Sequence, residues 1–208
     1  KGELTEKEEV LFDCNEMAQG KDYFRLVGIS VSPDNTKVAF GIDTVSRRQY
    51  TLKIKDLISD KLLETKIDNT TGGSLWASDN ATLFYNKKDD QTLRSEAVYK
   101  HQINSTKQAD QLVYEEVDET YSVYVSSSKS REFIFISSHS TTTSEHRFIR
   151  SDQPEADFKI IQTRTTGLEY DVAHFGDHFY IHTNFNGATN FQIMRTAIYQ
   201  TSSAFWEP

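Results

Sequence analysis

The amino-acid sequence predicts an all-β protein: a partial β-propeller of about four four-stranded antiparallel blades, excerpted from a longer ring. The first observation is a repeat, because alternating apolar strands begin at Tyr50, Ala97, His146 and Phe191, which are 47, 49 and 45 residues apart. Such a period is typical of propeller blades. The second is that each of these strands follows another apolar strand. The third is the lack of sustained helical periodicity, which argues against helical solenoids.

Each repeat unit is expected to contain four strands that run from the centre of the propeller to its rim. Inner strands are predicted at 26–31, 74–76, 121–125 and 170–174, and second strands at 37–40, 81–85, 132–136 and 178–182. Third strands are predicted at 50–54, 97–101, 146–150 and 191–195, and outer strands at 61–66, 111–115 and 158–162. Apolar and polar residues alternate in these segments, as in half-buried strands. The predicted blades are 22–67, 68–117, 118–166 and 167–208, all within one domain fragment, 1–208.

The two ends of this arrangement do not complete a ring. Residues 9–13 are predicted to form an outer strand of a preceding blade, and the fourth unit reaches 205–208 where its own outer strand should begin. Propellers close by joining their first and last blades, and they hold about four to eight blades. Unpaired strand edges and exposed apolar faces favour association. We therefore expect the isolated chain to self-associate.

Composition excludes several classes of partner. The chain has 31 acidic and 23 basic residues and a net charge of -8, whereas nucleic-acid binding requires basic patches. No stretch approaches the roughly 18 consecutive apolar residues of a membrane span. The only cysteine, Cys14, cannot form an internal disulfide. We expect no nucleic acid and no membrane among the partners.

No motif for catalysis or cofactor binding is present. The nearest approach to a Gly-x-Ser-x-Gly nucleophile elbow is Gly72-Gly73-Ser74-Leu75-Trp76, which has Trp where the closing Gly is required. P-loop, dinucleotide-binding and paired-cysteine zinc motifs are also absent. The sequence therefore predicts no catalytic residue, no cofactor and no metal in this chain.

Two clusters of titratable residues have simple structural interpretations. His174, His178 and His182 would share one face of a helix and could there bind a metal, but the residues between them read as a turn and a strand. We interpret them as ordinary strand histidines. Polar runs at 87–90, 115–116 and 118–119 are interpreted as solvated turns.

Arg47 and Arg48 are the candidate contact residues. They are adjacent and stand where a strand emerges from a hairpin connection at one face of the propeller. A fixed guanidinium there suits a carboxylate on a facing domain. The alternative is an exposed loop pair without a partner.

Matching segments occur in order from about Glu9 to the end of the chain, and no single one is decisive. They are Val31-Ser32-Pro33-Asp34-Asn35-Thr36, 43–50, 114–116 with 121–123, 142–145, 169–172 with 178–180, 183–184 with 190–191, and 206–207. Together they resemble the propeller of oligopeptidase B, or protease II, a branch of the prolyl oligopeptidase family of serine peptidases.

The resemblance implies a seven-bladed ring, of which this chain would supply roughly the second to fifth blades. It also implies a C-terminal α/β-hydrolase domain of the same polypeptide, which would hold a Ser-Asp-His triad. The propeller would cover the catalytic cavity and admit oligopeptides while excluding folded proteins. The full enzyme is expected to cut after Lys or Arg, in the cytoplasm or alternatively the periplasm. This chain alone is expected to be inactive.

Two other functions stay open on the sequence alone. A non-enzymatic WD40 or Kelch-like scaffold would bind proteins across its face, but the recurring Gly-His and Trp-Asp signatures are lacking. A propeller similar to that of dipeptidyl peptidase IV would capture a substrate amino terminus with a pair of glutamates. Glu115 and Glu116 could mimic that pair, although a solvated turn is the simpler interpretation.

Overall fold

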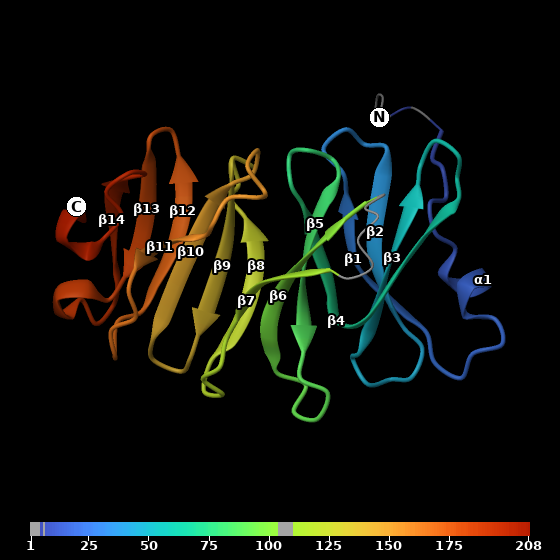
Figure 1. Cartoon of the computed structure of the whole chain (residues 1–208), viewed down its shortest axis with the longest axis horizontal. Coiled ribbons are helices and arrows are strands. Elements are labelled where there is room, and N and C mark those ends of the chain that lie inside the picture. The colour runs from blue at the N-terminus through green and yellow to red at the C-terminus, as the bar shows by residue number, and fades with distance from the viewer. Residues whose placement is uncertain (1–4, 6, 104–109) are drawn as a thin grey trace.

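Three antiparallel sheets stand side by side in the computed structural model, which describes residue 5 and residues 7–103 and 110–208 (Figure 1). The helical elements in these residues are short: α1 (Cys14–Ala18), and the 3-10 helices η1 (Phe185–Gly187) and η2 (Ser203–Phe205). Among the described residues, no helix has the length and apolar character needed to cross a membrane. The all-β, antiparallel prediction is confirmed.

The first sheet contains seven strands that pair in chain order. They are β1 (Arg25–Val31), β2 (Lys37–Asp43), β3 (Tyr50–Asp56), β4 (Leu62–Trp76), β5 (Thr82–Lys88), β6 (Ser95–Gln102) and β7 (Gln111–Glu115). The long strand β4 belongs to two groups of strands, β1–β4 and β4–β7. Its Ile67 lies opposite Leu52 of β3, and its Ser74 lies opposite Tyr85 of β5. A continuous backbone therefore carries an outer strand of one group into an inner strand of the next.

The second sheet has four strands and the third has three. They are β8 (Ser122–Ser127), β9 (Phe133–His139), β10 (Ser144–Arg150), β11 (Lys159–Gln162), and then β12 (Tyr170–Phe175), β13 (His178–Thr183) and β14 (Gln192–Ala197). Beyond η2, Glu207 forms an isolated antiparallel bridge with Arg195 of β14. This bridge lies where the sequence predicts the outer strand of the fourth unit to begin.

Aspartate turns set the start of the second strand in the first two units. Asp34 accepts hydrogen bonds from the backbone N–H and the hydroxyl of Thr36, and Asp79 accepts from both groups of Thr82. Asn35 and Asn80 follow these aspartates with φ near +57° and +59°, a conformation that Asn tolerates better than most residues. The side chain of Asn80 also accepts from the backbone N–H of Asp34, which ties consecutive units together.

Aromatic side chains fill the space between the second and third sheets. Phe133, Phe148 and Phe179 are buried. The ring centroid of Phe179 lies 5.2 Å from that of Phe133 and 5.0 Å from that of Phe148, both in edge-to-face geometry. Tyr170 and Trp206 extend this cluster towards the chain's C-terminal residues. Each such ring buries a large apolar area, so this contact is a main source of stability between units.

The predicted inner, second, third and outer strands all overlap strands of the structure, whereas residues 9–13 are not in a strand. Those residues have no ladder partner among the described residues, and an extended segment needs one to satisfy its backbone. The ring of Phe12 packs on Phe40 instead, with centroids 4.5 Å apart, and Asp13 caps α1. The blade boundaries, the assignment of 9–13 to a preceding blade and the seven-bladed ring stay predictions.

We expect the 208-residue chain to self-associate when it is purified on its own. The first group of strands exposes Ile29 and Ile58, and the last exposes Ile193 and Tyr199, each more than half accessible. Exposed apolar side chains beside open strand edges are association sites. Sedimentation velocity at several concentrations should show a rising average mass, and a concentration-independent monomer would contradict the prediction.

Candidate functional site

One edge of the molecule carries the hairpin loops that join second to third strands, together with the crossings between sheets. Because successive strands are antiparallel, the loops 44–49, 89–94 and 140–143 lie at the same edge as the crossings 116–121 and 163–169. Figure 1 shows the loops β2–β3 and β5–β6 at the lower end of their strands. We call this set of loops and crossings the loop edge. Loops on a rigid scaffold are where binding functions concentrate.

Arg47 and Arg48 lie exposed on the loop edge, on a backbone that is firmly held. The carboxylate of Asp43, itself 1% exposed, accepts hydrogen bonds from the backbone N–H groups of Val45, Ser46 and Arg48 at 2.8 to 3.0 Å. Lys88 donates to the carbonyl oxygen of Arg48 at 2.6 Å. Neither guanidinium forms an ion pair with another described residue. The loop therefore presents two arginines in a fixed position.

A buried ion-pair network lies on the same edge and links the first sheet to the second and to the crossing that leads to the third. Arg164, in the crossing to β12, donates to Glu116 at 2.5 Å and lies 3.6 Å from Glu145. Arg147 pairs with the same Glu145 at 2.7 Å, and the hydroxyl of Tyr114 donates to Glu116 at 2.9 Å. Glu116 and Glu145 are 3% and 5% exposed. Two carboxylates thus share two arginines inside the protein.

The interpretation of Glu115–Glu116 as a solvated turn is wrong for Glu116. Glu115 is exposed, whereas Glu116 is enclosed by Arg164 and Tyr114, so it is not free to bind an amino terminus. Burial alone would raise the pKa of Glu116, but the hydrogen bonds from Arg164 and Tyr114 outweigh it and hold that pKa below its usual range. The only sequence signal for the pairing of Glu116 with Arg164 is their separation of 48 residues, which is one repeat period.

The three histidines spaced by four do not come together. His174 lies opposite Phe179 in the β12–β13 ladder, so it shares the face of Phe179, whereas His178 and His182 project from the other face of β13. His174 is buried, with Nδ1 2.8 Å from Ser130 Oγ, and His182 stacks on Phe191. The strand interpretation of these residues is confirmed.

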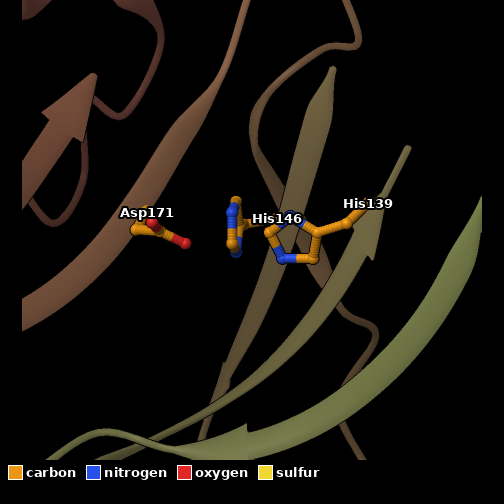
Figure 2. Close-up of side chains that lie close together, drawn as sticks. All are labelled: His139, His146 and Asp171. Carbon is orange, nitrogen blue, oxygen red and sulfur yellow. The ribbon is translucent and has the colours of Figure 1, made fainter. Parts of the chain in front are cut away.

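A different group of possible metal ligands is formed by His139, His146 and Asp171 (Figure 2). They come from β9, β10 and β12, and one ligand atom from each lies within 4.8 Å of the others. His146 is 4% exposed, its Nε2 lies 2.6 Å from the carbonyl oxygen of Tyr170, and its Nδ1 lies 2.8 Å from Ser137 Oγ. Burial, and next the neighbouring His139, lower the pKa of His146 to about 4. The sequence analysis missed this group, because its members are dispersed over two units.

Comparison with known proteins decides the family. The model of the family described as "Prolyl oligopeptidase, N-terminal beta-propeller domain" matches residues 1–208. The chain belongs to this family. The resemblance to the prolyl oligopeptidase propeller is confirmed, and the WD40 or Kelch-like scaffold is replaced by a propeller domain of the peptidase family.

Curated relatives of the prolyl oligopeptidase propeller are named as peptidases. The chain is 38% identical to "Dipeptidyl aminopeptidase BI" of Pseudoxanthomonas mexicana, over 96% of its own length and 28% of that protein. It is 34% identical to "Protease 2" of Moraxella lacunata, over 94% of its own length and again 28% of that protein. The chain therefore spans little more than a quarter of the length of these relatives.

Solved structures agree with the propeller assignment. Oligopeptidase B from Leishmania major is similar with a TM-score of 0.89 and 28% identity, covering 96% of this chain and 29% of that one. Oligopeptidase B from Trypanosoma brucei, in a closed form with covalently bound antipain, has a TM-score of 0.87. Its identity is 22%, so this likeness concerns the fold alone.

Proposed function

We propose that this chain is the substrate-filtering propeller of a serine oligopeptidase of the oligopeptidase B type. The observation that carries the proposal is the likeness to Leishmania major oligopeptidase B over nearly the whole chain. The full-length protein would hydrolyse short peptides after Lys or Arg, using a Ser-Asp-His triad in a C-terminal α/β-hydrolase domain of the same polypeptide. We propose the cytoplasm as its location, with the periplasm as the alternative, which cell fractionation tests.

In this proposal the propeller acts by geometry and not by chemistry. The described residues contain no nucleophile elbow, and the buried carboxylates of Glu116 and Glu145 are tied to arginines inside the protein. The propeller would cover the triad, so that an unfolded oligopeptide reaches it and a folded protein does not. Arg47 and Arg48 would meet a carboxylate of the hydrolase domain, and their firmly held loop and exposed side chains support this role.

A second activity is supported by the 38% identity to the dipeptidyl aminopeptidase of Pseudoxanthomonas mexicana. That enzyme's name describes release of dipeptides from a free amino terminus. The network around Glu116 does not favour this activity for the present chain, because the only buried carboxylates on the loop edge, among the described residues, are Asp43, Glu116 and Glu145, and all accept hydrogen bonds within the propeller. The substrate tests below separate the two.

Activity is expected in the full-length protein and not in the 208-residue chain. Catalysis needs an assembled triad, and none of its motifs occurs here. The measurement uses two fluorogenic peptides with arginine before the reporter group, one with a blocked amino terminus and one a free dipeptide. Hydrolysis of the blocked peptide by the full-length protein supports the oligopeptidase, and hydrolysis of the free dipeptide alone supports the aminopeptidase. Turnover by the purified 208-residue chain would contradict both accounts.

The interdomain role of Arg47 and Arg48 is tested in the full-length enzyme. Replacing either by alanine is expected to lower kcat/KM about ten-fold or more, since a desolvated charge-assisted contact contributes about 1.5 to 3 kcal/mol. Small-angle scattering should show a more open protein. Arg131→Ala is the matched control, because Arg131 is an exposed arginine in a turn at the opposite edge, with a positive φ like that of Arg48. Unchanged kinetics and unchanged scattering in both variants would exclude the contact.

A further inference from the structure

His139 and Asp171 line a cavity between the second and third sheets, and the buried His146 has a ligand atom within 4.8 Å of one on each of them. The cavity has a volume of about 250 Å³ and is also lined by Glu169, His182 and Phe191. Figure 2 shows the carboxylate of Asp171 and the ring of His139 on opposite sides of the His146 ring. The three residues belong to strands of two different sheets, so a ligand bound by all of them would bridge the sheets.

The donor set fits a transition metal better than a hard cation. Two imidazole nitrogens and one carboxylate oxygen are the kind of ligands that Zn²⁺ and its neighbours bind, whereas Ca²⁺ and Mg²⁺ require mostly oxygen. Three protein ligands leave one position of a tetrahedral ion open for water. The cavity beside the group provides room for that water.

The group is partly organised for binding. His146 is buried and oriented by Ser137 and by the Tyr170 carbonyl, and metal-bound imidazoles are held by such a carbonyl through their second nitrogen. A metal ion would replace one of these two hydrogen bonds. His139 is half-buried and Asp171 is exposed, so small rotations of these side chains can bring their ligand atoms from within 4.8 Å to bonding distance.

We propose that His139, His146 and Asp171 form a binding site for a divalent transition-metal ion of the zinc class, which links the second sheet to the third. The site uses none of the residues of the proposed interdomain contact. It therefore stands independently of the peptidase proposal.

The test titrates the full-length protein, after removal of bound metal with a chelator, with CoCl₂ and with ZnCl₂. The expected result is saturable binding in the micromolar range, with the visible absorption of a low-coordinate Co²⁺ ion that Zn²⁺ abolishes. Zinc should also raise the melting temperature. His139→Ala and Asp171→Asn are each expected to weaken binding at least about ten-fold, because even the loss of a residue that only supports a metal ligand lowers metal affinity by about ten-fold or more. Both changes lie at accessible side chains, so circular dichroism should show folded protein.

Matched controls use His178 and the adjacent Asp177, which line no part of this cavity. His178→Ala and Asp177→Asn remove the same chemical groups at the other end of the β12–β13 ladder and are expected to leave metal affinity unchanged. Wild-type protein that binds neither ion would overturn the proposal. So would His139→Ala and Asp171→Asn variants that bind cobalt and zinc as tightly as the wild type does.

Discussion

Replacement of Glu116 by alanine is expected to lower the free energy of unfolding by about 3 kcal/mol, the lower end of the range for breaking a buried ion pair. The side chain of Glu116 is 3% exposed, and its removal leaves the guanidinium of Arg164 without its 2.5 Å partner. The loss is not larger because Arg164 keeps Glu145 at 3.6 Å and stays over the ring of Tyr121. Urea denaturation of the 208-residue chain, followed by circular dichroism at fixed concentration, measures the effect.

Glu115→Ala is the matched control for this change. Glu115 is the exposed neighbour with the same side chain, and its replacement is expected to alter stability by less than about 0.5 kcal/mol. Equal urea midpoints for the two variants would contradict the assigned role of Glu116.

The pH dependence of the unfolding free energy gives a second test of the role of Glu116. Because the pKa of Glu116 is lower in the folded protein than its ordinary value of 4.5, its ionised form adds stability above that pH. This stability is lost as the pH falls below 4.5 and through the lowered pKa. The difference in unfolding free energy between the wild type and Glu116→Gln should therefore be full at neutral pH and shrink in acid. A difference that stays constant with pH would contradict the sign of this pKa shift.

Gly28→Ala is expected to destabilise the first sheet by about 2 to 5 kcal/mol. Gly28 has a φ of +64°, which costs other residues roughly 1 to 2 kcal/mol. Its added Cβ would lie 2.0 Å from the carbonyl oxygen of Gly72, and overpacking of this kind adds about 1 to 3 kcal/mol. The contact joins β1 to β4 where β4 passes from one group of strands to the next, so the neighbouring backbone cannot easily move away.

Gly73→Ala is the control for Gly28→Ala. Gly73 lies in the same part of β4, but a Cβ added there would meet no atom within 4 Å and its φ is not positive. We expect Gly73→Ala to leave the free energy of unfolding unchanged or to raise it by up to about 1 kcal/mol, because alanine lowers the conformational entropy of the unfolded chain. The comparison uses the same denaturation measurement, and a Gly28→Ala variant as stable as Gly73→Ala would show that the close approach is not a constraint.

Much of the fold was predictable because its causes are local. The apolar runs around Phe40, Phe84 and Phe135 indicate strands that are buried on both faces, and the aspartate turns that precede two of them act within three residues. Repetition of this local pattern predicts antiparallel units in order. Residues 9–13 lie outside the sheets of this chain because an apolar segment forms a strand only where another strand is present to pair with it.

The exposed position of Arg47 and Arg48 was also open to sequence reasoning, since a hairpin loop places its polar residues outside. The sequence by itself thus determined the strand order, the turn positions, the family and the candidate loop. Each of these depends on residues close together in the chain, or on a pattern repeated at a fixed period.

Only the tertiary structure decided which charged and polar side chains meet. Glu116 looks like its exposed neighbour Glu115 in the sequence, and it is distinguished only by Arg164, which packing of the sheets brings to it from 48 residues away. His139, His146 and Asp171 likewise come together only because β12 packs beside β9 and β10. A side chain's burial and partners depend on the neighbouring sheet, and residues of that sheet leave no signal in the local sequence.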